Sequence, residues 1–246
     1  MELIPPKTNR KIEFLPMGEQ ILIVQFEEIL SIEQNQIVQR FAEVIKSLKI
    51  RGVKDIVKGM CNFSILYDPL LINFEQLKDK LIHIDFTEVS GREKESRMVH
   101  IPVVFDEQYG LDLSELAKKL GFSEEEIVEI ITSNAYYVYM IGFIAGLPYM
   151  GNLDERIAVP RKSNPRVKVP KGAVAIANQM TSIYTVESPG GWHIVGWTPM
   201  DIFDETKNPP NFITAGDYVK YEPISAKVAH KWNSQVQKEW DQLWNI

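Results

Sequence analysis

Two arginines and a histidine lie in a glycine- and proline-rich stretch, residues 142–199, where their types and spacing could bind and process an anion. Arg161 and Arg166 flank a short Ser-Asn-Pro step, and one guanidinium can hold two oxygens of a carboxylate or a phosphate. His193 is the one histidine of the stretch, and its ordinary pKa near neutrality would let it relay a proton. The alternative is a pair of surface charges beside a structural histidine.

The run from Ser188 to Trp192, SPGGW, could also recognise an anion. Backbone N–H groups of a turn at Gly190 and Gly191 could cradle anionic oxygens. Ser188 itself is not expected to be a nucleophile, because it lacks the Gly-x-Ser-x-Gly elbow. Lys168 and Lys171 add positive charge to the stretch, which is informative on a chain whose formal net charge is −6.

Glycine and proline recur at short intervals through residues 142–199, with aromatic and basic residues between them. Glycine permits left-handed backbone, whereas proline fixes φ and removes a donor, so the stretch cannot be one long helix. The pattern predicts short strands joined by tight turns, with side chains converging on a concave surface. The alternative is a loop-rich β-barrel whose glycines and prolines only turn corners.

The first part of the chain, residues 1–90, predicts a small α+β domain. Its strand-like runs are residues 20–26, 53–57, 63–67 and 83–89. Ser31 and Asn73 each precede an amphipathic segment and have Gln three residues later, which predicts two capped helices. The resulting order, β-α-β-β-α-β, is the ferredoxin-like arrangement. The polar run at residues 90–97 predicts a linker.

The second part, residues 98–246, predicts a mostly β domain with helices. Asp112 and Ser123, each followed by Glu three residues later, predict two capped helices, and Gly121 would end the first. A terminal helix is expected over residues 226–244. Its apolar residues recur every four positions: Val228, Trp232, Val236, Trp240 and Trp244. We favour docking of this stripe on the domain over a face that binds a partner.

The composition is that of an ordinary globular chain, with 246 residues, 45% of them hydrophobic and 24% charged. The negative net charge argues against a nucleic-acid partner. The single cysteine, Cys61, excludes an internal disulfide and a cysteine-only metal site. The scattered histidines predict no metal centre. We expect a cytoplasmic protein, because neither a secretory leader nor an apolar run of the ~20 residues that cross a membrane is visible.

The order of residues along this stretch resembles the family of 5-oxoprolinase B subunits, also called allophanate hydrolase subunit 1 or the sporulation-kinase-inhibitor family. The family pattern GF-x-PGFPYLG, PR, PR-x-x-VP-x-GSVGIAG, TGIYP, ESPGGW and IGRTP runs along it without gaps. The matching residues are Gly142, Phe143, Gly146, Pro148, Tyr149, Gly151, Pro160, Arg161, Pro165, Arg166, Val169, Pro170, Gly172, Thr181, Ile183, Tyr184, Glu187 to Trp192, Gly196, Thr198 and Pro199. The resemblance implies an α+β chain: a ferredoxin-like N-terminal domain, a cyclophilin-like β-barrel and the terminal helix.

The resemblance also implies a function. The chain would be the B subunit of an ATP-dependent 5-oxoprolinase, which opens 5-oxo-L-proline to L-glutamate with two further subunits, a homologous one (C) and a separate one (A), and would be inactive alone. Arg161, Arg166 and the turn at 188–191 would hold anionic oxygens, and His193 would relay a proton. Three aromatic residues would shape the pocket: Tyr139, Tyr149 and Trp192. Because the chain has no Walker A motif, ATP is expected at an unconventional site or on a partner subunit.

Several positions depart from the family pattern and suggest a remodelled pocket. Ile131, Ala135, Ala145, Ser182 and Trp197 stand where the family has His, Glu, Pro, Gly and Arg, and Leu147, Ala175, Asn178 and Thr185 replace Phe, Gly, Gly and Pro. The chain lacks the ionisable His, Glu and Arg that the family has at positions 131, 135 and 197. This loss and the tryptophan stripe slightly favour an alternative function, that of a regulatory protein that inhibits a sensor histidine kinase. A relative of the carboxyltransferase half of biotin-dependent urea carboxylase ranks last, because the chain is too short to hold the other parts.

Overall fold

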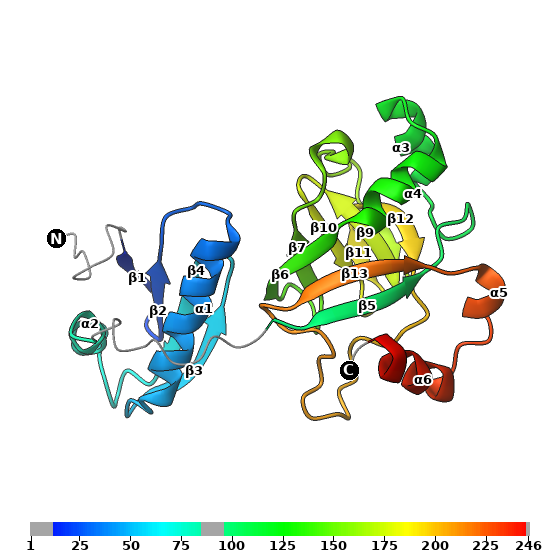
Figure 1. The fold of residues 1–246 in the computed structure, drawn as a ribbon. Coiled ribbons are helices and arrows are strands. Elements are labelled where there is room, and N and C mark those ends of the chain that lie inside the picture. The colour runs from blue at the N-terminus through cyan, green and yellow to red at the C-terminus, as the bar shows by residue number, and fades with distance from the viewer. Residues whose placement is uncertain (1–11, 85–95, 245–246) are drawn as a thin grey trace. The chain divides into compact units, whose positions relative to one another are not determined.

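The computed structural model describes residues 12–84 and 96–244, and its contacts divide the chain into two compact units, Met1–Glu95 and Ser96–Ile246 (Figure 1). Each unit has its own hydrophobic core. The predicted linker at 90–97 lies mostly outside the described residues, so the division into domains 1–90 and 98–246 stays a prediction. No helix in the described ranges is both long and apolar enough to cross a membrane.

The N-terminal unit is a four-stranded antiparallel sheet with two helices. The strands are β1 (Glu13–Met17), β2 (Ile21–Gln25), β3 (Val53–Lys58) and β4 (Asn62–Tyr67), and the helices are α1 (Ile32–Ser47) and α2 (Phe74–Ile82). Their order in the sheet is β1-β2-β4-β3. Alternate residues of β2 and β4 are buried against the helices, because successive side chains of a strand point to opposite faces.

The ferredoxin-like arrangement predicted for this unit is not confirmed. The order β2-β4-β3 agrees with it, but the edge beside β2 is occupied by β1, which the sequence did not predict. This strand is mostly exposed and contains Pro16, so it lacks alternating burial and fits only an edge. Of the predicted last strand, residues 83 and 84 are not in a strand, and 85–89 lie outside the described residues. The N-caps at Ser31 and Asn73 are confirmed.

The C-terminal unit is built on a seven-stranded sheet. Its strands are β5 (Met98–Val103), β6 (Ala135–Ile141), β7 (Pro148–Gly151), β9 (Ala173–Ala177), β10 (Met180–Ile183), β12 (His193–Trp197) and β13 (Tyr218–Pro223). They follow the order β12-β9-β10-β7-β6-β13-β5, and Figure 1 shows β13 and β5 side by side. Val104 and Trp197 exchange backbone hydrogen bonds of 2.8 and 3.0 Å, which join the two ends of this order. The predicted β-barrel is therefore confirmed as a nearly closed sheet.

A two-stranded ribbon covers part of the outer face of this barrel. It pairs β8 (Arg166–Val169) with β11 (Ser188–Gly190). Strand β9 is buried on both faces: Val174 and Ile176 point into the main core, whereas its three alanines face a second cluster that includes Tyr184 and Trp192. Small side chains on β9 leave room for these rings, so Tyr184 gathers on the ribbon side with two of the predicted aromatic residues, Tyr149 and Trp192.

Helices α3 (Leu113–Leu120) and α4 (Glu124–Ser133) pack on the barrel and add apolar side chains to its main core. A short 3₁₀ helix spans Glu155–Ile157. The capping box at Ser123 is confirmed, and Gly121 ends α3 with φ of 76°. The predicted cap at Asp112 is wrong, because its side chain makes no bond to the first turn of α3. The Asp112 carboxylate instead accepts hydrogen bonds from Arg166 of the ribbon.

The predicted terminal helix is two helices, α5 (Ala226–Ala229) and α6 (Ser234–Trp244). The break has a local cause, since Asn233 Oδ1 accepts from the N–H groups of Gln235 and Val236 and begins a new helix. Trp232 and Trp240 pack against the barrel core, and Trp240 Nε1 donates to the carbonyl of His100 at 2.8 Å. The favoured docking of the tryptophan stripe is therefore confirmed for these two residues.

Candidate functional site

Three predicted site residues, Arg161, Tyr149 and Trp192, come together on the ribbon side of the barrel. The Arg161 guanidinium lies 5.7 Å from the centre of the Trp192 ring. The rings of Tyr149 and Trp192 meet edge to face at 5.8 Å. No carboxylate in the described part of the chain pairs with Arg161, which is exposed. Its guanidinium can therefore bind an anion while it rests on the aromatic ring.

Tyr184 joins this cluster, although the sequence did not single it out as a site residue. It follows β10 and packs with Trp192 in the second cluster. Burial raises the pKa of Tyr184, and the positive charge of Arg161 opposes that rise. The phenol stays protonated at neutral pH, so its hydroxyl can donate to an anion held by Arg161. Its place in the family motif TGIYP was the available signal.

Arg166 is engaged elsewhere. Its NH1 and NH2 groups donate to the two carboxylate oxygens of Asp112 at 2.7 and 2.8 Å. Lys162 Nζ and the N–H of Ile194 also donate to Asp112, each at 2.7 Å. Burial alone would raise the pKa of Asp112, but these hydrogen bonds outweigh it and hold the pKa below its ordinary value. Arg166 therefore ties the ribbon to α3 and β12, and its fork is occupied.

His193 lies on β12 and points away from the Arg161 cluster. It pairs across the sheet with Ile176, whose side chain is in the main core, so both point to that side. Its Nε2 donates to the carbonyl of Pro160 at 3.0 Å, since a carbonyl only accepts. Nδ1 is buried and has no hydrogen-bond partner among the described residues. The described residues also hold no cluster of three or more His, Cys, Asp or Glu that could bind a metal ion.

The turn predicted at residues 188–191 is wrong, because Ser188–Gly190 forms strand β11. Gly190 is required by packing: an added Cβ would lie 2.1 Å from the Tyr184 hydroxyl oxygen. Gly191 contributes its carbonyl, which accepts from the N–H of Lys162 at 2.7 Å. The Ser188 hydroxyl is buried without a partner in the described ranges. The packing of Tyr184 thus accounts for Gly190 without an anion cradle.

Tyr139, the remaining predicted residue, is buried on β6. Its ring packs edge to face on Tyr137 at 5.0 Å. It also fills the space beside Gly151, where an added Cβ would lie 2.4 Å from the ring. Tyr139 is therefore part of the wall of the barrel.

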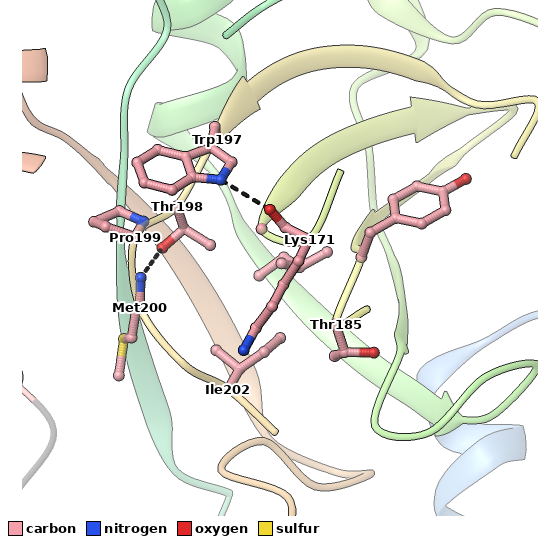
Figure 2. A pocket seen from close by; sticks show the side chains of 10 residues that line it. Lys171, Thr185, Trp197, Thr198, Pro199, Met200 and Ile202 are labelled. Carbon is pink, nitrogen blue, oxygen red and sulfur yellow. Dashed lines mark hydrogen bonds between the residues drawn. The ribbon is translucent and has the colours of Figure 1, made fainter. Parts of the chain in front are cut away.

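A pocket of about 110 Å³ opens where β10 and β12 end (Figure 2). Its main lining residues are Lys171, Ile183, Thr185, Trp197, Thr198 and Ile202. Trp197 Nε1 donates to the carbonyl of Lys171 at 2.9 Å, and the indole stacks on Tyr109 with ring centres 5.0 Å apart. Lys171 was noted in the sequence for its positive charge, Tyr184 and Thr198 match the family pattern, and Thr185 and Trp197 depart from it, but no spacing in the sequence showed that these lining residues meet in one pocket.

The other main departures lie in packed positions. Ile131 lies on α4 with its side chain in the main core, and Ala135 begins β6. The carbonyl of Ala145 accepts from Thr185 Oγ1 at 2.5 Å. Ser182 on β10 is 1% exposed, and its hydroxyl has no partner among the residues that the structure describes.

Comparison with known proteins shows the family to which this chain belongs. Residues 12–213 match the family model described as carboxyltransferase domain, subdomain C and D. The chain belongs to this carboxyltransferase-domain family. It is 34% identical over 233 residues to the 5-oxoprolinase B subunit of Bacillus subtilis, and the match covers 89% of this chain and 95% of that relative. The predicted resemblance to 5-oxoprolinase B subunits is thereby confirmed.

Solved structures share the fold of this carboxyltransferase-domain chain. A conserved uncharacterized protein of Pyrococcus horikoshii is 36% identical, with a TM-score of 0.53 over 88% of this chain and 100% of that one. The urea amidolyase of K. lactis superposes with a TM-score of 0.75 over 92% of this chain, which spans 16% of that larger protein. At 20% identity, the latter likeness shows the fold alone.

Proposed function

We propose that the chain is the B subunit of an ATP-dependent 5-oxoprolinase, which opens 5-oxo-L-proline to L-glutamate together with the A and C subunits. The observation that carries this proposal is a nearly end-to-end similarity to chains with that name. The match covers 95% of the Bacillus subtilis protein and 97% of the Haemophilus influenzae protein, at 34% and 33% identity. The chain thus corresponds in extent to one subunit, and the remaining subunits would be separate chains.

The reaction demands activation of a stable amide. A γ-lactam resists hydrolysis because amide resonance makes its carbonyl carbon a poor electrophile. Transfer of a phosphoryl group from ATP to the lactam oxygen would make that carbon more electrophilic. Water then adds to the carbon, and the C–N bond breaks as nitrogen takes a proton, which leaves γ-glutamyl phosphate. A second water hydrolyses this acyl phosphate, and the products are glutamate and inorganic phosphate. The intermediate gains negative charge, which a positioned cation stabilises. Arg161 supports this role, because it is exposed and lies beside the protonated phenol of Tyr184.

Two of the residues predicted to act in this reaction receive less support from the geometry. Arg166 is held by Asp112 and would position the ribbon rather than bind substrate. His193 faces the main core, so a proton relay through its buried Nδ1 would have to reach a different side of the sheet from Arg161. In this proposal Arg161 and Tyr184 carry anion binding on this chain, and ATP is used by the complex.

Purification of the chain with its native partners tests the proposal. A tagged chain recovered from its own cells should bring with it the A and C subunits, of which the second is homologous to this chain. The competing hypothesis, a regulator of a sensor histidine kinase, requires that kinase to co-purify and the two 5-oxoprolinase subunits to be absent. Recovery of the kinase alone would contradict the enzymatic proposal.

A further inference from the structure

The pocket beneath Trp197 has fixed apolar walls. Ile183, Met200 and Ile202 are no more than 3% exposed, and they line it together with the indole. The indole cannot easily swing away, because it stacks on Tyr109 and donates to the carbonyl of Lys171. A cavity of roughly 150 Å³ holds benzene. At about 110 Å³, this pocket suits a smaller body, such as a five-membered ring.

Lys171 provides a cation at the edge of this pocket. Its side chain is 54% exposed, and its Nζ lies 2.6 Å from Asp201 Oδ1. An ammonium group has three donors, so this pairing leaves others for a ligand. In Figure 2 the Lys171 side chain runs across the pocket towards Ile202, with Thr198 on one side and Thr185 on the other. An anionic group bound here would keep partial contact with water.

Thr198 provides a buried donor. It is 2% exposed, and its Oγ1 accepts from the N–H of Met200 at 3.1 Å. Its own hydroxyl proton is donated to no acceptor among the described residues. A buried hydroxyl that does not donate loses free energy, so an acceptor on a ligand would satisfy it.

We propose that this pocket binds a small cyclic carboxylic acid. The ring would lie against Trp197 and Ile202, a ring carbonyl would accept from Thr198, and the carboxylate would pair with Lys171. The ligand class follows from the chemistry of the lining residues. The choice of 5-oxo-L-proline, which has a five-membered ring, one ring carbonyl and one carboxylate, rests on the proposed function. Arg161 does not line this pocket, which leaves it for a second anion such as a phosphoryl group.

Titration of the full chain, without other subunits, tests the pocket directly. 5-Oxo-L-proline is added to wild type and variants and followed by calorimetry and ligand-observed NMR. Lys171→Gln should weaken binding about tenfold, the lower end for a charge-assisted contact, because Lys171 is half exposed. Asp201→Asn should strengthen binding, because it removes the carboxylate that competes for Lys171. Opposite effects at the two ends of one ion pair would not follow from loss of folding.

Lys168→Gln is the matched control. Lys168 is also an exposed lysine in a salt bridge, 3.0 Å from Glu187, but it does not line the pocket. This variant makes the same change in net charge and should bind as wild type does. Cyclopentanecarboxylate serves as the second probe. It lacks the ring carbonyl, so wild type should prefer 5-oxo-L-proline, and Thr198→Val should abolish the preference.

The outcomes separate the pocket from the proposed function. No binding up to the solubility limit, unchanged affinity in Lys171→Gln, or equal loss in Lys168→Gln would overturn the pocket. Binding with the expected variant pattern, but no turnover after the A and C subunits are added, would uphold the pocket and contradict the proposed function. Turnover that is insensitive to Lys171→Gln and Thr198→Val would uphold the function and contradict the pocket.

Discussion

Replacing Asp112 by asparagine should destabilise the C-terminal unit strongly. Asp112 is 1% exposed and accepts hydrogen bonds from Arg166, Lys162 and the N–H of Ile194. Asparagine keeps the size of the side chain, but it removes the charge and puts donors where the two cations donate. Breaking a buried ion pair costs about 3–5 kcal/mol. We expect about 3 kcal/mol, the lower end, because the Lys162 and Arg166 side chains keep 20% and 27% exposure.

Thermal unfolding by circular dichroism measures this cost. At about 2–4 °C per kcal/mol for a unit of this size, the Tm should fall by roughly 6–12 °C at neutral pH. Glu115→Gln is the control. Glu115 also approaches Lys162, at 3.4 Å, but it is 70% exposed, so the change should cost no more than about 0.5 kcal/mol.

The pH dependence of folding stability is a second test of the ion pair between Asp112 and Arg166. The pKa of Asp112 is lower in the folded chain than in the unfolded chain, so its carboxylate stabilises the fold above the unfolded pKa of about 3.9 and loses that effect as pH falls through the folded pKa. The gap between wild type and Asp112→Asn should therefore close in acid. Adding Arg166→Met to Asp112→Asn should cost little more, since the interaction is already broken. A Tm within about 2 °C of wild type, or additive losses, would refute this reasoning.

Further predictions concern the ribbon, Arg161 and the division into domains. Gly190→Ala should cost about 1–3 kcal/mol by urea unfolding, because the new Cβ meets the Tyr184 hydroxyl, whereas Gly191→Ala, whose nearest neighbour is 3.6 Å away, should not. Arg161→Gln should weaken anion binding by the reconstituted complex about ten- to a hundredfold without lowering the Tm, and equal affinities would retire its role. Limited proteolysis should cut within residues 90–97 and leave two folded fragments; a cut that unfolds either fragment would contradict two domains.

Local signals allowed much of the fold to be predicted. The caps at Asn73 and Ser123 and the stop at Gly121 depend on residues a few positions apart, and all three are confirmed. The barrel followed from the resemblance, and the Gly/Pro-rich stretch agreed with it because its pattern predicted short strands joined by tight turns. By contrast, β1 is a short edge strand with a proline and little burial, so it shows no alternation that could predict it.

Long-range contacts decided what could not be predicted at the site. Asp112 looks like an N-cap in sequence, yet its partners lie 50, 54 and 82 positions away, where no local spacing can indicate them. The same contact changes the interpretation of Arg166 from an anion ligand to a structural cation. Ser188–Gly190 reads as a turn from its glycines, but pairing with β8 makes it a strand.

The central claim, that this chain is a working subunit of a 5-oxoprolinase, is tested most directly by glutamate release. The purified chain is mixed with the A and C subunits and supplied with 5-oxo-L-proline, and glutamate is measured with and without ATP. We expect glutamate only when all three subunits and ATP are present, and none from this chain alone. No ATP-dependent glutamate from the assembled subunits, or equal release when this chain is left out, would contradict the claim.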